Sequence, residues 1–307
     1  MSVRIATIVF DGITALLLAA IPLYILELRK RWNDRGFVLK RRRRVFFAFV
    51  LGVVWLAVFY GSLVEPRLLF TRRYAVRLGD GGGKLVVAVV SDTHFGVFKG
   101  RQWADKIVSR VNETEPDVVL LAGDFSANDA GLEALAAFGG FRSRFGTFAV
   151  LGNYDYRVGA VDLRRRIESY GVEVLTNESL PLPAAGREVR LIGLDDLWYG
   201  SPDWDAALRE VPDDALKIVL GHNPDLAPGA EAAGLDLLIA GHTHGGQVRL
   251  PVIGPLTRLP VMIGQRFDRG LFDFGPLRLF ISPGAGETGA RARLFCPPEI
   301  SLLELDY

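Results

Sequence analysis

Six short runs of branched apolar residues constrain the fold of this chain more than any other feature. The runs comprise residues 85–90, 117–122, 147–151, 189–194, 216–220 and 235–240. Runs of this length and composition are typical of strands that are buried on both faces of a sheet. Segments with helical character lie between them, at 102–114, 130–142, 160–170 and 203–210. The alternation predicts an α/β domain, to which the segment 277–306 is expected to add strands.

Two apolar segments precede this domain. The twenty residues from Val45 to Val64 carry no charge, and about twenty such residues cross a hydrocarbon core of about 30 Å as a helix. The segment 5–26 is nearly as apolar but contains Asp11 and Pro22. An aspartate costs less near a helix end, where Asp11 lies, than at the centre of a span. Both segments are therefore predicted to span a membrane, at about 5–26 and 45–64.

The first apolar segment has an alternative interpretation as a cleaved signal peptide, but no convincing small-residue cleavage site follows it. We therefore expect a two-helix membrane anchor in residues 1–80, in contact with the lipid bilayer, and a separate domain in residues 81–307. The loop between the spans, residues 29–44, carries nine Lys and Arg, whereas residues 65–80 carry four. Because basic loops favour the cytoplasmic side, the domain is predicted on the extracytoplasmic face of the cytoplasmic membrane.

Charge and cysteine content exclude several classes of function. The first 80 residues hold fourteen Lys and Arg against five Asp and Glu, a net charge of +9, and the remaining residues hold twenty-two against thirty, a net charge of −8. An acidic domain argues against a nucleic-acid partner, which requires a basic face. The single cysteine, Cys296, excludes an intrachain disulfide and a thiolate metal cluster.

Polar side chains follow five of the six apolar runs. They are Asp92 and His94 after the first run, Asp124 after the second, Asn153 after the third, His222 after the fifth, and His242 and His244 after the sixth. In open α/β folds, functional groups collect at the carboxyl ends of the strands, so these residues are expected to face one crevice. Glycines beside most of them allow sharp turns that bring the loops close together.

The histidines make a metal site the best interpretation of this pattern. The chain has four histidines, and each one follows an apolar run. A single histidine at such a place is more often a hydrogen-bonded turn or core residue, but four of them with two aspartates and an asparagine favour metal ligands. Imidazole and carboxylate without thiolate suit Mn, Fe or Zn. Seven ligands exceed one tetrahedral ion and fit two divalent metal ions that share a carboxylate, about 3.5–4 Å apart.

The ordered set DxH, GD, GN, GH and GHTHGG resembles the motifs of the calcineurin-like metallophosphoesterase superfamily. The segments "GHTHGGQVRLP" at 241–251 and "RARLFCPPEISLLEL" at 291–305 resemble its membrane-associated bacterial envelope branch. That branch includes phosphodiesterases and lipid-linked UDP-sugar pyrophosphatases. The resemblance covers about residues 85–306 and implies a four-layer α/β/β/α sandwich with a dinuclear metal site between the sheets, preceded here by the two transmembrane helices.

The resemblance also implies a ligand set. One metal would be held by Asp92, His94, Asp124 and His244, and the other by Asp124, Asn153, His222 and His242, with Asp124 bridging. Asn153 would bind through its amide oxygen. The family pattern has a histidine at position 154 that contacts the substrate phosphate and helps to protonate the leaving group, whereas this chain has Tyr154. Either the leaving group needs little protonation, or Tyr154 or Asp155 supplies the proton.

These residues predict a membrane-anchored, metal-dependent phosphoesterase. It would hydrolyse a phosphodiester or pyrophosphate bond of a cell-envelope or lipid-linked substrate, by attack of a hydroxide that bridges the metals. The alternatives are a cytoplasmic-facing UDP-diacylglucosamine-type pyrophosphatase and a catalytically silent metal-binding scaffold. Four further charged residues are weaker site candidates, because turn-stabilising or surface roles are at least as common for them. They are Asp195, Asp196, Arg291 and Arg293.

Overall fold

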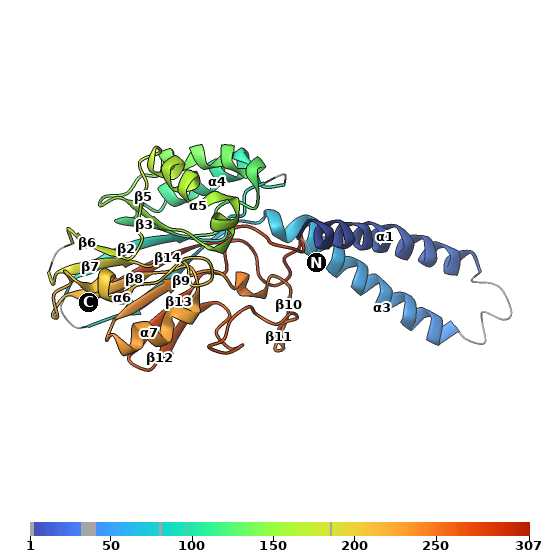
Figure 1. Cartoon of the computed structure of the whole chain (residues 1–307). Coiled ribbons are helices and arrows are strands. Elements are labelled where there is room, and N and C mark those ends of the chain that lie inside the picture. The colour runs from blue at the N-terminus through green and yellow to red at the C-terminus, as the bar shows by residue number, and fades with distance from the viewer. Residues whose placement is uncertain (1–2, 32–40, 80–81, 97, 185) are drawn as a thin grey trace.

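The structure is a computed structural model that describes residues 3–31, 41–79, 82–96, 98–184 and 186–307 (Figure 1). Most of the predicted basic loop, residues 29–44, lies outside these ranges. Two long helices project from one end of a domain that contains two sheets (Figure 1). All six apolar runs that were predicted to be strands are strands in the structure.

The first sheet has six strands within the described residues, in the order β1-β14-β2-β3-β4-β5. Strands β2, β3, β4 and β5 are parallel to one another, whereas β14 runs antiparallel to β2 and parallel to β1. The bounds are β1 Phe70–Arg77, β2 Lys84–Val90, β3 Val118–Ala122, β4 Thr147–Val150, β5 Glu173–Val174 and β14 Glu299–Asp306.

The second sheet also has six strands in the described part of the chain, in the order β12-β13-β9-β8-β7-β6. Strands β7, β8, β9 and β13 are parallel, and the edge strands β6 and β12 run antiparallel to their neighbours. The bounds are β6 Glu178–Leu182, β7 Val189–Gly193, β8 Leu216–Leu220, β9 Leu237–Ala240, β12 Gly270–Phe274 and β13 Leu277–Ile281. The predicted strands within 277–306 are therefore β13 and β14, one in each sheet.

Helices cover the outer face of each sheet. The first sheet is covered by α4 Arg101–Asn112, η3 Asp129–Gly140 and α5 Asn153–Glu168, and the second by α6 Trp204–Leu208, η4 Pro224–Leu226 and α7 Ala227–Ala232. A third apolar core lies between the sheets and includes Val87, Leu120, Ile218 and Ile239. The layers are therefore helices, sheet, sheet and helices, as predicted. The segment predicted as a helix at 130–142 forms 3-10 turns instead of an α-helix.

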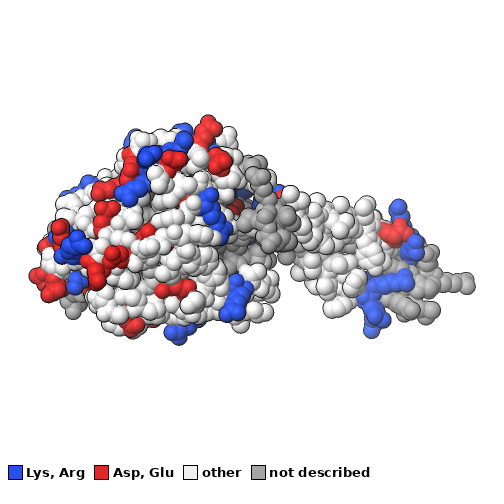
Figure 2. Space-filling model, in the orientation of Figure 1, with Lys and Arg blue, Asp and Glu red and all other residues white. Residues whose placement is uncertain are grey.

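The N-terminal segments form two helices of which each is long and apolar enough to cross a membrane. Helix α1 spans Val3–Lys30, and α3 spans Arg41–Phe59 and continues into the single-turn helices η1, Tyr60–Val64, and η2, Glu65–Arg67. The indole Nε1 of Trp55 donates a hydrogen bond to the carbonyl oxygen of Leu18 at 3.0 Å, so the two helices pack together. Figure 2 shows few charged side chains along the middle of this hairpin.

The helical hairpin is joined to the sheet domain by polar contacts. Arg291 Nε donates to Asp11 Oδ1 of α1 at 2.9 Å, which gives the aspartate of the first apolar segment a partner of opposite charge. The carboxylate of Glu65 accepts hydrogen bonds from the backbone N–H groups of Phe295 and Cys296. Strand β1 pairs with β14 over residues 70–77. The predicted boundary at residue 80 therefore leaves one strand of the first sheet on the anchor side.

Candidate metal centre

The predicted ligands meet where the central strands of both sheets end. Asp92 and His94 follow β2, Asp124 follows β3, and Asn153 begins α5 after β4. From the second sheet, His222 follows β8, and His242 and His244 follow β9, where His244 begins the turn η5, His244–Gly246. All seven side chains are buried. Five of these residues have left-handed backbone angles: Asp92, His94, Asp124, His242 and His244. Such angles cost non-glycine residues about 1–3 kcal/mol and cluster at functional sites.

Two groups of side chains could each hold a metal ion among the described residues. The first is Asp92, His94 and His244, and the second is Asp124, His222 and His242. In the first group, His244 Nε2 lies 3.4 Å from Asp92 Oδ1 and 3.0 Å from His94 Nε2. In the second group, His242 Nδ1 lies 3.2 Å from His222 Nε2. The oxygen Oδ1 of Asn153 is 3.2 Å from the same His222 nitrogen, so Asn153 extends the second group.

The carboxylate of Asp124 lies between the two groups. Its Oδ2 atom is 3.4 Å from His94 Nε2 and 3.3 Å from His222 Nε2. Its Oδ1 atom accepts a hydrogen bond from the backbone N–H of Tyr154 at 2.7 Å. One oxygen is thus fixed by the backbone, and the other is left facing both groups. This is the arrangement expected of a carboxylate that bridges two cations.

Electrostatics prepare most of these side chains to bind cations. Burial lowers the pKa of His94 to about 4 and that of His242 to about 3, so both rings are neutral near pH 7 and can donate a lone pair. Burial also disfavours charge on His222, but the carboxylates of Asp124 and Asp92 outweigh it and raise the pKa of His222 to about 10. Without a cation, His222 therefore serves as the positive partner of Asp124.

The donor chemistry of the site fits divalent metal ions. His222 Nδ1 lies 2.7 Å from the carbonyl oxygen of Ala122, which directs Nε2 into the crevice. The Nδ1 atoms of His94 and His244 are buried and have no hydrogen-bond partner among the described residues. The Nε2 atoms of these two rings converge, and burial lowers the pKa of His244 as well. Two neutral nitrogens that face each other at this distance are stabilised by a cation between them.

Asp155 holds the ligand loops together, and the hypothesis that it supplies a proton stays a prediction. Its carboxylate is fully buried and accepts hydrogen bonds from the backbone N–H groups of Gly152, Asp124 and Phe125, each at 2.8 Å. These bonds tie the loop after β3 to the loop after β4. Asp155 therefore positions Asp124 and Asn153, a role that the sequence pattern did not reveal.

Tyr154 lines the crevice, but its hydroxyl group has a partner away from the two metal-binding groups. The ring meets His94 edge-on, with 4.6 Å between the ring centres. The hydroxyl oxygen lies 2.8 Å from Thr288 Oγ1, and the backbone N–H of Thr288 donates to Gln247 Oε1. Tyr154 therefore connects the loop after β4 with the loop after β13. In this arrangement its hydroxyl is a tether.

A cationic and aromatic rim borders the crevice, and its arginine was not predicted from the sequence. The guanidinium of Arg157 lies over the rings of Tyr154 and Tyr199, 4.9 Å and 5.1 Å from their centres. Its Nη2 donates to the Tyr199 hydroxyl at 2.8 Å. Trp198 is half exposed and meets His242 edge-on, with 4.4 Å between the ring centres. The only sequence signal for Arg157 is its place one turn after Asn153.

The weaker candidates have structural roles. Asp196 accepts hydrogen bonds from the backbone N–H groups of Trp198 and Tyr199, and Asp195 accepts from that of Ser201. Both aspartates therefore stabilise the turn after β7, which sets the position of the aromatic rim.

Arg293 is also structural. It is fully buried and donates to the carbonyl oxygens of Pro283, Gly286 and Cys296. These bonds hold the loop that packs on Asp92 and Thr93, where a Cβ atom on Gly286 would come within 2.0 Å of the Thr93 carbonyl oxygen. Arg293 thus fixes the loop against which Asp92, a member of the first metal-binding group, is packed.

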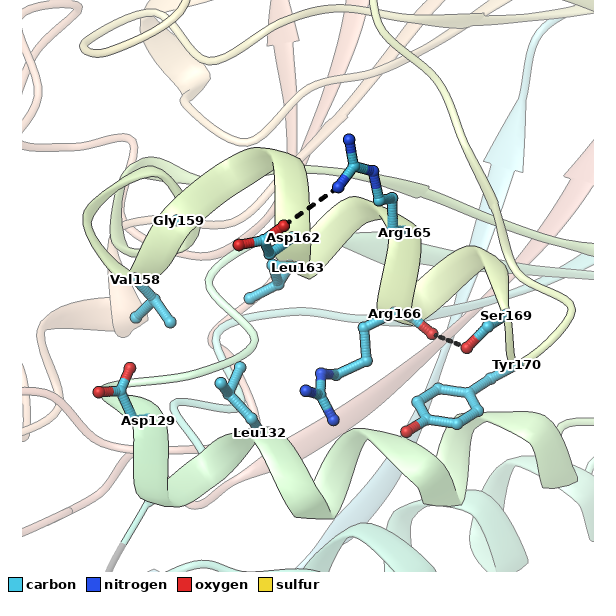
Figure 3. A pocket seen from close by; sticks show the side chains of 10 residues that line it. All are labelled: Asp129, Leu132, Val158, Gly159, Asp162, Leu163, Arg165, Arg166, Ser169 and Tyr170. Atoms are coloured by element: carbon cyan, nitrogen blue, oxygen red, sulfur yellow. Dashed lines mark hydrogen bonds and ion pairs between the residues drawn. The ribbon is translucent and has the colours of Figure 1, made fainter.

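A separate cavity of about 580 Å³ lies between η3 and α5 (Figure 3). It is lined by Asp129, Leu132, Val158, Gly159, Asp162, Leu163, Arg165, Arg166, Ser169 and Tyr170. None of the seven predicted ligands contributes to this lining, and the side chains of Arg165 and Ser169 bond to Asp162 and to the Arg166 carbonyl. The cavity is therefore not the metal centre.

Comparison with known proteins agrees with the geometry of the site. Residues 85–246 match the family of calcineurin-like phosphoesterases, a range that contains all seven predicted ligands. Phosphodiesterase YaeI of Escherichia coli is 31% identical over 80% of this chain and 88% of its own length. The uncharacterized metallophosphoesterase YkuE of Bacillus subtilis is 26% identical over 80% of this chain and 88% of its own length.

A relative from cattle links this domain to membranes. The Bos taurus "transmembrane protein with metallophosphoesterase domain" is 32% identical over 89% of this chain and 64% of its own length. Together with the two long apolar helices, this relative indicates membrane association. The chain belongs to the calcineurin-like phosphoesterase family and is a metal-dependent phosphoesterase.

Proposed function

We propose that this protein is a membrane-anchored hydrolase that cleaves a phosphodiester or pyrophosphate bond in a lipid-linked or cell-envelope substrate, with two divalent metal ions. The observation that carries the proposal is the position of Asp124 Oδ2, within 3.4 Å of a nitrogen from each metal-binding group. A carboxylate shared in this way supports a two-metal site.

The residues at this site have two roles in the proposed reaction, which are to bind the cations and to hold the ligand loops in place. Two cations bound at this site would lower the pKa of water and neutralise charge on the phosphoryl oxygens. Asp92, His94 and His244 would hold one of them, Asn153, His222 and His242 would hold the other, and Asp124 would be shared. Asp155 and Arg293 keep the ligand loops in place through buried hydrogen bonds. Ligands held in place in this way do not have to rearrange when the transition state forms, which lowers the barrier.

Arg157 is suited to bind an oxygen of the substrate that does not react. Its guanidinium is exposed and lies over the Tyr154 ring, which itself contacts His94. A planar guanidinium can pair with two phosphate oxygens at once. A second phosphate or the far ester of a phosphodiester would extend from the metal centre toward this rim. The name of the relative from Escherichia coli, a phosphodiesterase, supports a diester substrate.

The proximity of the metal centre to the helical hairpin supports a substrate that resides in the membrane. The loop of residues 283–296 packs on Asp92 at one end and on Glu65, at the end of the second helix, at the other. A lipid-linked phosphoester would therefore travel a short distance from the bilayer to the site.

Hydrolysis by the purified full-length chain in detergent micelles tests the proposal. Chromogenic phosphomonoester, phosphodiester and pyrophosphate substrates are compared in Mn²⁺, with Asp124→Asn as the control. We expect metal-dependent cleavage of the diester or the pyrophosphate, and loss of that cleavage in Asp124→Asn. A preference for the monoester would contradict the proposed substrate class, and equal activity of Asp124→Asn would contradict the two-metal site.

A further inference from the structure

An exposed apolar hairpin extends from the domain beside the metal centre. It comprises residues 249–262, with strands β10, Arg249–Leu250, and β11, Gly254–Pro255; we call it the apolar hairpin. Val252, Ile253 and Met262 are 106%, 72% and 91% exposed, and Leu256 is exposed as well. A cluster of large exposed apolar side chains marks a surface for a protein or membrane partner.

The tip of the apolar hairpin is also conformationally costly. Val252 has a φ angle of 70°, in the left-handed region. A β-branched residue rarely adopts this conformation, because its side chain crowds the backbone. Its side chain contributes no burial to offset that cost. An apolar environment outside the chain would supply the burial that this side chain lacks in the structure.

The apolar hairpin lies at the end of the domain from which the membrane helices project (Figure 1). The residue before it, Val248, forms a β-bridge with Leu294, and the backbone N–H of Arg249 donates to the Leu294 carbonyl. Leu294 in turn packs against Gly61 of η1, where a Cβ atom would lie 3.5 Å from that of Leu294. Leu294 therefore contacts both the base of the apolar hairpin and the end of the second apolar helix.

The charge of this region suits an anionic lipid surface. Residues 249–269 contain four arginines and one aspartate, a net charge of +3, although residues 81–307 as a whole carry −8. Arg249 pairs with Asp268 at 2.6 Å, whereas Arg258 and Arg266 are exposed. Basic side chains near an anionic membrane surface favour binding to it. Exposed apolar residues flanked by arginines are typical of segments that lie in a membrane interface.

Both ends of the apolar hairpin contact the metal centre. The turn with His244 leads directly into β10, and Arg249 Nη1 donates to the Gly245 carbonyl at 2.8 Å. On the return, the carbonyl oxygen of Pro260 lies 3.3 Å from His242 Nε2. A force that fixes the hairpin in a membrane interface therefore also fixes the metal centre relative to that interface.

We propose that the apolar hairpin inserts into the interface of the bilayer that the two helices cross, and holds the metal centre beside the phosphates of lipid-linked substrates. The proposal rests on the membrane anchoring proposed above and adds a second, independent contact with the same bilayer. Insertion removes the exposed apolar surface of Val252, Ile253, Leu256 and Met262 from water, which favours the inserted state.

Quenching by labelled lipids tests the insertion in the full-length protein. Ile253→Cys is labelled with a fluorophore and reconstituted into vesicles of zwitterionic and anionic phospholipids that carry a quencher on the upper acyl chain. Cys296 is buried, so the wild-type chain gives the background of labelling. Val161→Cys, on α5, is the control for an exposed site on the domain, and Phe49→Cys, on α3, is the control for the membrane helices.

We expect severalfold stronger quenching at position 253 than at position 161. Quenching at position 49 without quenching at position 253 would overturn the inserted hairpin and leave the anchor intact. Absence of quenching at both positions would overturn the anchor and the hairpin together. A label at 253 that is shielded from both lipid and a water-soluble quencher would assign the hairpin to a protein contact and would also overturn the proposal.

A pair of charged substitutions tests the consequence for substrate access. Val252→Asp with Ile253→Asp places two carboxylates where the interface would be, and we expect cleavage of a phosphodiester embedded in vesicles to fall severalfold. Cleavage of a soluble chromogenic diester should stay unchanged, as it should for the control Val161→Asp. An equal loss on both substrates, or no loss on either, would contradict a role of the hairpin at the membrane.

Discussion

Asp124 is the residue on which the proposed two-metal site depends. Its two carboxylate oxygens have different partners, because the Tyr154 N–H holds Oδ1 and the two histidine nitrogens face Oδ2. An amide at this position keeps the shape and removes the charge. Since a shared carboxylate is needed to keep two cations close together, Asp124→Asn should lose metal from both groups rather than from one.

The hydroxyl of Tyr154 is expected to act as a tether and not as an acid. Tyr154→Phe removes its hydrogen bond to Thr288, which is worth about 0.5–1.5 kcal/mol, so kcat should fall by no more than about tenfold. The loss should be the same for diesters with good and with poor leaving groups. The matched control Thr288→Val should lose as much, and the double variant no more. A loss that grows with the pKa of the leaving group would show that the hydroxyl supplies a proton.

Arg157 is expected to govern binding of the substrate more than its chemical step. Replacing it with glutamine removes the cation above Tyr154 but leaves the metal-binding groups untouched. We expect Arg157→Gln to raise KM for a phosphodiester by about tenfold, the size of one lost charged hydrogen bond, with little change in kcat. Arg165→Gln, on the same helix, is the control. Steady-state kinetics decide, and an unchanged KM would remove Arg157 from the site.

At the scale of elements, the loops after β3 and β4 depend on two glycines for their close approach. A Cβ atom on Gly152 would lie 2.4 Å from Asp124 Oδ1, and one on Gly123 would lie 2.8 Å from His222 Nδ1. Gly152 has a φ angle of −107°, which alanine also adopts, so contact and not backbone strain forbids a side chain there.

Gly152→Ala should therefore displace Asp124 and destabilise the fold by about 1–3 kcal/mol through overpacking. We expect lower metal occupancy and a lower Tm. Gly100→Ala is the matched control, because a Cβ atom there would be 3.8 Å from its nearest neighbour, the Gly96 carbonyl oxygen. Thermal unfolding and elemental analysis of the two variants would separate them. Full metal occupancy in Gly152→Ala would show that the loops can accommodate a larger side chain than the structure indicates.

The sequence predicted the strands and the residues at their ends, because both signals are local. A run of branched apolar residues followed by a polar residue can be read within ten positions, as at Val118–Asp124. The contacts that join distant segments left no such signal. Strand β1 pairs with β14 across more than two hundred residues, and Tyr154 meets Thr288 across 134. The role of Asp155 was hidden for the same reason, since two of its three partners are the backbone N–H groups of Asp124 and Phe125, in another loop.

For the molecule as a whole, the charge of the segments at the two ends of the membrane helices is the relevant feature. The loop of residues 29–44 is strongly basic, whereas the domain lies at the opposite ends of both helices (Figure 1). By the preference of basic loops for the cytoplasm, the domain should lie outside the cytoplasmic membrane. This orientation disfavours a substrate made from a cytoplasmic nucleotide.

A reporter fused after Tyr307 tests this orientation in a bacterial host. We expect alkaline phosphatase, which requires an oxidising compartment, to be active in the fusion, and a cytoplasmic fluorescent reporter to be dark. Replacing the basic residues 40–44 with glutamines should weaken the preference. The reverse pattern would place the domain in the cytoplasm and would favour a UDP-lipid pyrophosphatase over an enzyme of the outer face.

The count of metal ions per chain tests the central claim of a two-metal phosphoesterase most directly. The full-length protein is stripped with a chelator, reloaded with Mn²⁺, freed of excess metal and analysed for metal and protein together. We predict two ions per folded chain in the wild type, and a loss of both in Asp124→Asn, because its carboxylate is shared. A single ion per folded wild-type chain, or an unchanged count in Asp124→Asn, would contradict a site built around a bridging Asp124.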